Sequence, residues 1–394
     1  MGLEIPGFTF SITCAGIRGT ERADMALMVS DPPARWSGTF TTNRVKAAPV
    51  LLGMKRLRDG APISAILVNS GNANACNGEQ GMEDALMLCR ETARLLGVPE
   101  EQVLMASTGV IGQPLPMDKM MAALPGLVER AGQATLEDVA RAIMTTDRYP
   151  KWELEDAPGY PRVKIGGVAK GAGMIRPDMA TMLGFFFLNA GLPTPQLGAI
   201  TKQAVAGSFN CITVDGDQST NDTVLVLDNG TPPEDPKKRE GVAGAVSEKL
   251  NAVMKSLAWK IVDNGEGVNK VVTLEVKGAQ TIEDARRVSE SVGNSPLVKT
   301  AFYGEDPNWG RIMAAIGYSG AEIDPGKIRI AFEDTLLVAD GQWTGIEAER
   351  KVAETMKKRA YTVRIDLGRG NAVYRLVTSD LSVDYVKINA DYRS

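Results

Sequence analysis

The amino-acid sequence predicts a mixed α/β fold, and two observations support this class. Short apolar runs of strand length alternate with longer segments of helical periodicity along the chain. No internal repeat or low-complexity tract interrupts this alternation. The alternation does not by itself distinguish one parallel sheet from stacked layers. A length of 394 residues favours two or three structural units.

The individual elements follow from the hydrophobic pattern and from breaker residues. Strands are expected at 63–68, 103–106, 181–188, 224–228, 271–276, 361–367 and 371–377. Helices are expected at 83–96, 136–144, 197–205, 242–262 and 346–357. Gly97 and Pro99 end the first of these helices, and Asn308 is expected to cap a further one. The proline-rich segment 231–238 is expected to be a solvated loop.

Composition and charge bound the possible functions. The chain is 44% hydrophobic and 23% charged, as in ordinary globular enzymes, and a formal net charge of −4 gives no support for binding nucleic acid or an anionic membrane. No apolar run could span a bilayer and the first residues lack a signal-peptide pattern, so a cytoplasmic location is expected. The absence of histidine and of Cys-x-x-Cys pairs argues against zinc. Cys14, Cys76, Cys89 and Cys211 are expected to be free, buried thiols in a reducing compartment.

The most informative segment is 166–185, where a glycine-rich polar stretch leads through Ala180 to Thr181 and then to an apolar run. If the bond before a threonine is cut, that residue carries a nucleophilic hydroxyl and a free α-amine that serves as its base. The ordinary pKa of an α-amine, about 7.7–8.0, leaves part of it unprotonated near neutral pH. Because the chain has no histidine, Ser-His-Asp and Cys-His arrangements are impossible, and the Thr181 amine is the most economical base.

The same segment also fits a glycine-rich turn between two core strands, and spacing alone does not decide between these interpretations. Two nucleotide-binding motifs are excluded. Lys170 precedes the glycines, whereas a Walker loop needs the lysine after them, and Arg176 stands where a dinucleotide fingerprint needs its third glycine.

Three other polar clusters could carry chemistry. Ser107-Thr108-Gly109 could donate to an oxyanion, although a capped turn after the preceding strand is the favoured structure. Residues 215–222 lack the glycine and the closing glutamate of a calcium loop, so an Asx-type turn is favoured over metal binding. In 263–267, two glycines flank Glu266, which indicates either close backbone approach with an aimed carboxylate or a helix C-cap followed by a surface glutamate.

Taken together, these clusters resemble one family, the ornithine acetyltransferases of arginine biosynthesis, also called bifunctional glutamate N-acetyltransferases. The matching segments are 41–50, 69–75, 107–112, 145–147, 170–183, 219–222, 294–301, 306–311 and 389–394. They occur in the family's order and cover nearly the whole chain; each is weak alone, and together they are highly specific. The resemblance implies a fold of stacked β-sheets flanked by helices, shared with self-processing hydrolases that use an N-terminal nucleophile.

The resemblance implies a two-step reaction by a chain that cuts itself between Ala180 and Thr181. The products would be an α chain of residues 1–180 and a β chain of residues 181–394, assembled as two copies of each. N-acetylornithine would acetylate Thr181 and release ornithine, and glutamate would then take the acetyl group. Some members also use acetyl-coenzyme A, which one sequence leaves open. The family implies no cofactor and no metal.

Further site residues follow from the resemblance. Thr108 and Gly109 match the family's oxyanion hole. The implied substrate-binding residues are Thr146, Lys170, Thr181, Glu266, Asn389 and Ser394, with Thr145 as the alternative to Thr146. The chain departs from the family pattern at Asp178, Asn264, Val268, Asn269 and Ser394. The first departure bears on the cleavage rate, the next three bear on the pocket around Glu266, and the last keeps a terminal hydroxyl.

Two other functions compete with this interpretation. A self-cleaving amidohydrolase or aminopeptidase would use the same Thr181 but pass the acyl group to water. A non-catalytic scaffold of this fold would be expected to lack Thr181 or Lys170, and both are present. The matches at 145–147, Asn389 and Ser394 favour the transferase, because these residues would hold the amino-acid acceptor.

Overall fold

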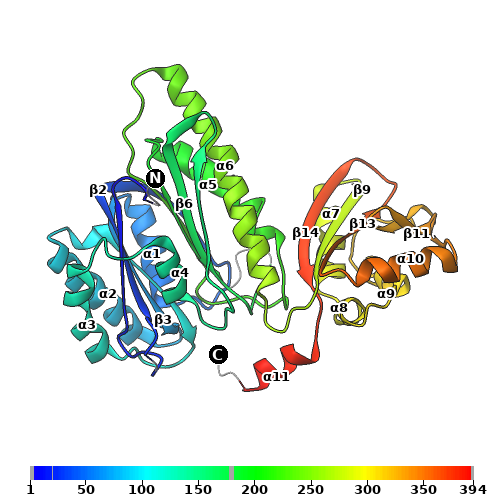
Figure 1. The fold of residues 1–394 in the computed structure, drawn as a ribbon, viewed down its shortest axis with the longest axis horizontal. Helices are drawn as coiled ribbons and strands as arrows, with labels where there is room; N and C mark the ends of the chain where they lie inside the picture. The colour runs from blue at the N-terminus through cyan, green and yellow to red at the C-terminus, as the bar shows by residue number, and fades with distance from the viewer. Residues whose placement is uncertain (1–3, 20, 177–181, 392–394) are drawn as a thin grey trace. The chain divides into compact units, whose positions relative to one another are not determined.

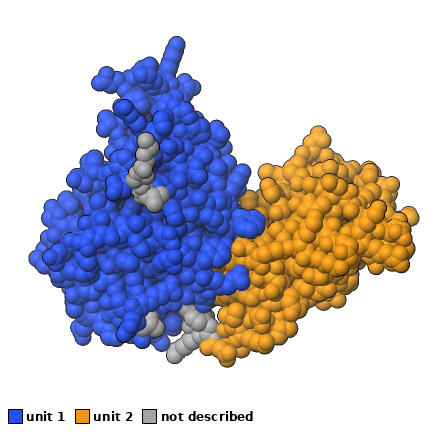
Figure 2. Space-filling view, in the orientation of Figure 1, with its two compact units in different colours: residues 1–210, 217–261, 394 blue, residues 211–216, 262–393 orange. Residues whose placement is uncertain are grey.

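The computed structural model describes residues 4–19, 21–176 and 182–391. The chain folds into two compact units, drawn in blue and orange in Figure 2. Unit 1 holds the chain up to residue 210 together with 217–261, and unit 2 holds 211–216 together with 262–393. The predicted boundary between an α and a β chain, after residue 180, is a covalent cut and lies outside the described residues.

Unit 1 is built on one eight-stranded sheet, in which seven strands follow the order β4-β3-β2-β8-β7-β6-β5 and β1 pairs with β2. Figure 1 labels β2, β3 and β6 of this sheet. Its strands are β1 (Phe8–Thr13), β2 (Met25–Phe40), β3 (Ile63–Asn72), β4 (Val103–Val110), β5 (Lys151–Ala157), β6 (Tyr160–Lys170), β7 (Leu183–Leu188) and β8 (Thr223–Asp228). The helices from the N-terminus onward are α1 (Ala48–Asp59), α2 (Gly78–Leu96), η1 (Glu100–Gln102), α3 (Met117–Glu129), α4 (Leu136–Ile143), α5 (Thr194–Ala206), η2 (Phe209–Cys211) and α6 (Pro236–Asp263). Within the described residues, no helix has both the length and the apolar character that crossing a membrane requires.

The long strand β2 divides this sheet into two layers. Its first part pairs with β1 and β3, and its last part pairs with β8. Phe8 and Phe10 of β1 pack against Phe187 of β7, with ring centroids 5.1 and 5.2 Å apart, so the two layers share one core. Helices α2 and α3 cover the outer face of the β2–β4 layer, and α5 and α6 flank the other layer. The expected fold of stacked sheets flanked by helices is therefore confirmed.

Strand β4 is longer than expected, and the difference matters for the site. It continues past Ala106 to Val110, in parallel register with β3, so Ser107-Thr108-Gly109 belongs to a strand and the favoured turn is wrong. The pairing continues because β3 also continues, and its polar end (Asn69 to Asn72) supplies the ladder partners. Hydrophobic pattern could not show this, since both strand ends are polar.

The first part of the glycine-rich stretch, 166–170, is a strand rather than a loop, whereas 171–176 lies outside the helices and strands. Gly166 and Gly167 lie in β6, which pairs with β5 on one side and β7 on the other. A Cβ on Gly167 would lie 2.6 Å from the ring of Phe186, and one on Gly166 would lie 2.1 Å from Ile5. These glycines make room for bulky neighbours in a tightly packed core, which is a recognised use of glycine within strands.

Unit 2 is a six-stranded sheet with the order β12-β11-β10-β13-β9-β14. Its strands are β9 (Val271–Ala279), β10 (Arg329–Phe332), β11 (Thr335–Ala339), β12 (Gln342–Trp343), β13 (Ala360–Asp366) and β14 (Ala372–Ser379). Its helices are α7 (Ile282–Gly293), α8 (Pro296–Tyr303), α9 (Trp309–Gly317), η3 (Pro325–Lys327), α10 (Ile346–Met356) and α11 (Val383–Asp391). Asn308 caps α9 as expected, because its side chain accepts a hydrogen bond from the Arg311 amide at 3.2 Å.

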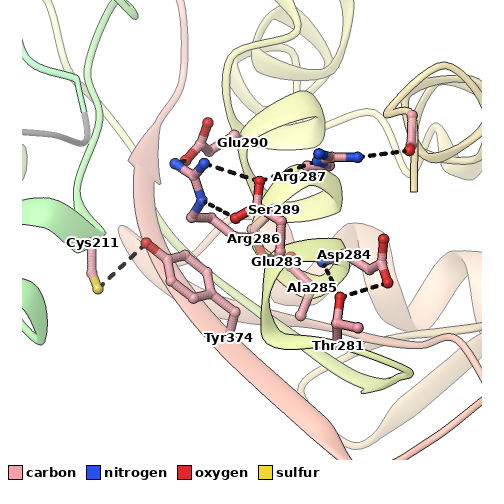
Figure 3. A network of polar contacts seen from close by, with 11 residues as sticks. Cys211, Thr281, Glu283, Asp284, Ala285, Arg286, Arg287, Ser289, Glu290 and Tyr374 are labelled. Carbon is pink, nitrogen blue, oxygen red and sulfur yellow. Dashed lines mark hydrogen bonds and ion pairs between the residues drawn. The ribbon is translucent and has the colours of Figure 1, made fainter. Parts of the chain in front are cut away.

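Helix α7 packs on β9 and β14 and is stabilised by a polar network on its surface (Figure 3). The Arg286 guanidinium donates to Glu283 at 2.9 Å and to Glu290 at 2.8 Å, one turn away on either side. Thr281 caps the helix by accepting from the Asp284 amide at 3.1 Å. This network involves no predicted site residue, so its role is to stabilise the helix.

The cysteines are free, as expected, but the expectation that all are buried is correct only for Cys89. Cys89 is buried inside α2 and Cys211 is half-buried. Cys14 and Cys76 are exposed, because each stands in a connection outside the strands and helices. Residue type alone does not show such local placement.

Candidate active site

The centre of the candidate site in unit 1 is the side chain of Lys170, the last residue of β6. It is 3% exposed, and its ammonium group donates hydrogen bonds to the Thr145 hydroxyl at 2.7 Å and to the Thr108 hydroxyl at 3.1 Å. One buried cation thus joins two threonines that are far apart in the sequence. The neighbouring Thr146 is half-buried, and its side chain hydrogen-bonds to none of the described residues.

Thr108 and Gly109 lie at the end of β4, directly beside β3. Gly109 has a φ of 136°, and a Cβ there would lie 2.2 Å from the carbonyl carbon of Gly71, so only glycine fits. Because Lys170 donates to the oxygen of the Thr108 hydroxyl, the hydrogen of that hydroxyl remains for another acceptor. This arrangement can direct a donor at an oxyanion and polarise it with the charge of Lys170.

Asp147 fixes the loop that carries Thr145 against the end of β6. Its buried carboxylate accepts from the Lys151 ammonium at 2.5 Å, from the Gly171 amide at 2.9 Å and from the Thr145 amide at 2.9 Å. Burial alone would raise the pKa of this carboxyl, but the charges of Lys151 and Lys170 outweigh it and hold the pKa well below its usual range. One ionised carboxylate therefore joins three segments of the site.

The segment 219–222 forms the hydrogen-bonded turn that its composition indicates. The Ser219 hydroxyl accepts from the Asn221 amide at 3.0 Å. The Asn221 side chain then donates to the Ser107 carbonyl at 2.8 Å and to the Ala73 carbonyl at 2.6 Å. These bonds hold the start of β8 against the polar ends of β3 and β4.

Asp222 stands between this turn and β8 and is a second buried carboxyl group in the site. It is 0% exposed, and its Oδ1 accepts from the Met182 amide at 2.6 Å. Burial raises the pKa of Asp222 well above its ordinary value, against the opposing effects of the Met182 amide and the charge of Lys170. Since Met182 directly follows Thr181 in the chain, Asp222 anchors the backbone immediately after the predicted nucleophile.

Two further predicted residues, Glu266 and Asn389, contact each other in unit 2. The Asn389 side chain donates to the Glu266 carboxylate at 2.8 Å and to the Tyr385 carbonyl at 3.1 Å. Gly267 has a φ of 67°, and a Cβ there would lie 2.4 Å from the Tyr385 nitrogen. The close backbone approach indicated by the glycines around Glu266 is therefore present, and the carboxylate is aimed at α11.

The structure groups some predicted residues and adds others. Ala180, Thr181 and Ser394 lie outside the described residues. Asp147 and Asp222 were missing from the candidates, although both stand in segments that match the family. For Asp222, the signal that could have found it is an acidic residue directly before the apolar strand β8, because a charge in such a position is seldom buried without a specific role.

Comparisons with known proteins extend this description to the whole chain. The sequence pattern of the ArgJ family matches residues 9–394. The chain is 48% identical over 395 residues to the arginine biosynthesis bifunctional protein ArgJ of Geobacter sulfurreducens and 46% identical over 396 residues to that of Desulfotalea psychrophila, with 100% of each chain covered. Among solved structures, it is 35% identical to ArgJ of Bacillus halodurans, with a TM-score of 0.48, covering 54% of this chain and 100% of that one.

The family match and the arginine biosynthesis relatives at 46–48% identity define the class as a biosynthetic acyltransferase. The chain belongs to the ArgJ family. The predictions that it is an enzyme of arginine biosynthesis and that it acts on small molecules are thereby confirmed.

Proposed function

We propose that this chain transfers an acetyl group from N2-acetylornithine to glutamate through an acetyl ester on Thr181. The observation that carries the proposal is the hydrogen bonding of Lys170 to Thr108 and Thr145, at the end of the strand that precedes the predicted cleavage point. The names of the relatives place them in arginine biosynthesis, where such a transfer belongs. The word "bifunctional" in those names also favours acetyl-coenzyme A as a second acetyl donor.

The chemistry is an acyl exchange in two halves. The Thr181 hydroxyl attacks the acetyl carbonyl of N-acetylornithine while its proton passes to the freed α-amine of the same residue. Thr108 and Gly109 stabilise the oxyanion, the C–N bond of the amide breaks, and the proton passes to the departing ornithine amine. The glutamate amine then attacks the ester, takes the acetyl group and restores the hydroxyl.

The nucleophile requires cleavage between Ala180 and Thr181. The products, residues 1–180 and 181–394, would remain together because β6 and β7 are neighbouring strands of one sheet, paired from Lys170–Leu183 to Ile165–Leu188. Cleavage would therefore free an amine without dissolving the core. We propose that two copies of each chain form the working assembly.

The remaining predicted residues suit the charges of the substrates. N-acetylornithine carries a carboxylate and a side-chain ammonium, and glutamate carries two carboxylates and an amine. Lys170 supplies a buried cation, Thr146 an uncommitted hydroxyl and Glu266 a carboxylate for the ammonium. Asn389 orients Glu266, and Ser394 is assigned to the acceptor.

The test combines intact mass with an acetyl balance. Purified protein is expected to give two masses that correspond to 1–180 and 181–394, and N-acetylornithine alone should add one acetyl group to the second chain. Glutamate should then remove that group as N-acetylglutamate, and a separate arm supplies acetyl-coenzyme A as the donor. Free acetate released equally with and without glutamate would instead assign an amidohydrolase, and an uncut, fully active chain would refute the mechanism.

A further inference from the structure

The buried carboxyl group of Asp222 satisfies only half of its hydrogen-bonding capacity within the described residues. Oδ1 accepts from the Met182 amide at 2.6 Å, while Oδ2 has no hydrogen-bond partner there. The nearby Thr41 hydroxyl gives its hydrogen to the Ser219 carbonyl at 2.9 Å. A buried polar atom without a partner costs about 1–3 kcal/mol, so an unpaired oxygen at this place calls for a reason.

We propose that Asp222 is a positioning residue, whose free oxygen holds the α-amino group that cleavage creates on Thr181. The inference rests on the proposed function, because it needs Thr181 to become an N-terminus. In the intact chain, the carboxyl would anchor only the Met182 amide. In the cleaved enzyme, it would also hold the new amine beside the hydroxyl that the amine must deprotonate.

The amine belongs to the residue directly before the one whose amide Asp222 already binds. Three bonds separate the nitrogen of any residue from the nitrogen of the next, so the Thr181 nitrogen can lie no more than about 3.7 Å from the Met182 nitrogen. Asp222 already contacts the Met182 nitrogen.

The change in charge on cleavage supplies the energetic reason. Before the cut, residue 181 contributes a neutral amide, and the raised pKa of Asp222 favours its protonated, neutral form. After the cut, an amine that carries a proton offsets the cost of the buried carboxylate, so the two groups share one proton. Lys170, whose charge also acts on Asp222, is already engaged by Thr108 and Thr145.

A role as a backbone anchor alone would look different, and the molecule contains the comparison. Asp228, at the other end of β8, is also 0% exposed. Its two oxygens accept from the amides of Ala190, Gly191, Leu192 and Gly230 at 2.6–3.0 Å. Asp228 thus uses both oxygens to anchor backbone, whereas Asp222 uses one within the described residues.

The experiment compares Asp222→Asn with the matched control Asp228→Asn in the full-length protein. Asparagine keeps an oxygen for the Met182 amide and places an NH2 group, which cannot accept from an amine, at the second position. Two quantities are measured: the pH dependence of kcat/KM for acetyl transfer, and the rate of reductive methylation of the Thr181 α-amine against pH, followed by mass spectrometry of its peptide. Electrophoresis reports cleavage separately.

Removing a carboxylate beside an amine lowers the pKa of that amine. In Asp222→Asn, we therefore expect both the ascending limb of the pH profile and the methylation midpoint to move to lower pH by about one unit or more. Transfer at neutral pH should fall about tenfold or more. Asp228→Asn should leave both midpoints in place. Unchanged midpoints in Asp222→Asn would overturn the proposal.

The experiment distinguishes failure of the proposed function from failure of the inference about Asp222. If wild type is cleaved but transfers no acetyl group, the function fails, whereas the methylation titration still decides the role of Asp222. If wild type stays uncut, both proposals fall. If Asp222→Asn does not fold, the wild-type amine is titrated folded and in urea: the carboxylate should keep the folded midpoint at or above the unfolded one, and a lower folded midpoint would contradict the inference.

Discussion

A buried aspartate lies at each end of strand β8: Asp222 directly precedes the strand, and Asp228 is its last residue. The two carboxyl groups differ in how many hydrogen bonds their oxygens accept. At the far end, Asp228 accepts four backbone amides and closes the connections that follow β7 and β8. At the near end, Asp222 accepts one amide, from Met182, and leaves Oδ2 without a partner in the described part of the chain. The two groups stand about 20 Å apart, the length of a six-residue strand.

The difference distinguishes a carboxylate that only stabilises the fold from one with an oxygen available for a functional partner. The saturated end of the strand belongs to the scaffold, and nothing predicted to be functional lies there. The unsaturated end adjoins Lys170, Thr108 and the start of β7, where the chemistry is proposed. A buried group that lacks a partner stores a cost that a substrate, a new terminus or a reaction intermediate can relieve.

The largest effect is expected at the unsaturated end, from Thr181→Ala. The variant removes the proposed nucleophile, so both cleavage and acetyl transfer should fall below detection, while Thr181→Ser should retain part of each. Because β7 and β8 are unaltered, the variant should keep the folded structure of wild type. Electrophoresis and N-terminal sequencing measure cleavage, a transfer assay measures activity and circular dichroism measures folding, and a cleaved, active Thr181→Ala protein would end the argument.

The sequence predicts the regular strands and helices of the fold more completely than it predicts the polar ends of the strands. Strands β3, β7, β8 and β9 and helices α2, α4 and α10 were expected close to their observed limits, since their apolar residues follow helical or strand spacing. Strands β1, β2, β5 and β6 were not foreseen. Strand β6 is glycine-rich at its buried end, because neighbouring side chains occupy the space that a Cβ would need. The pattern of residue types along the sequence does not show which side chains become neighbours in the fold.

The site was predictable to the extent that it resembles a family. Thr108, Gly109 and Lys170 were identified by that resemblance, and the structure brings Thr108 and Lys170 into contact. Asp147 and Asp222 were missed because their importance lies in burial and in what they accept, which appear only after folding. The choice between Thr145 and Thr146 was open for the same reason.

A second prediction extends the comparison to Asp147, the carboxylate with a full set of partners inside the site. Asp147→Asn removes the carboxylate that pairs with the buried ammonium of Lys151, and breaking such a pair costs about 3–5 kcal/mol of unfolding free energy. Glu137→Gln, which breaks an exposed pair with Arg141, is the control and should cost less than about 1 kcal/mol. Urea titration measures both, and equal losses would show that Asp147 is no more than a surface charge.

Thr108→Ala tests whether the unsaturated end acts on the transition state. Loss of an oxyanion donor should lower kcat by about 10²–10³-fold with little change in the melting temperature. Thr135→Ala is the matched control, since Thr135 caps α4 by accepting from the Asp138 amide at 3.2 Å. That variant should lose about 1 kcal/mol of stability and keep its kcat. A wild-type kcat for Thr108→Ala would leave Thr181 without an oxyanion partner.

Asp228→Asn should show the opposite pattern to changes at the site. Four amides point at this carboxylate, and an NH2 group in place of one oxygen would face at least one of them. We expect a loss of about 2–3 kcal/mol in unfolding free energy and transfer activity per folded molecule within about threefold of wild type. In the uncut Thr181→Ala background, Asp222→Asn should cost less stability than this, because within the described residues only one oxygen of Asp222 has a partner. The reverse ranking of the two variants would break the comparison.

The smallest expected effect is on the pH dependence of stability, measured in uncut Thr181→Ala protein so that no new amine is present. The folded-state pKa of Asp222 is raised, so across the window between its ordinary and raised values the folded state binds more protons than the unfolded state. Unfolding free energy should therefore fall as pH rises through that window, by up to about 1.4 kcal/mol per pH unit.

Asp147 acts with the opposite sign, because its pKa is lowered and its contribution is lost as pH falls below about 4. Urea titrations from pH 3 to pH 8 should show a maximum in stability between the two effects, and adding Asp222→Asn should remove the decline above the maximum while leaving the acid limb unchanged. If the decline in stability persists in the Asp222→Asn variant, the Asp222 carboxyl group is not the buried acid that causes it.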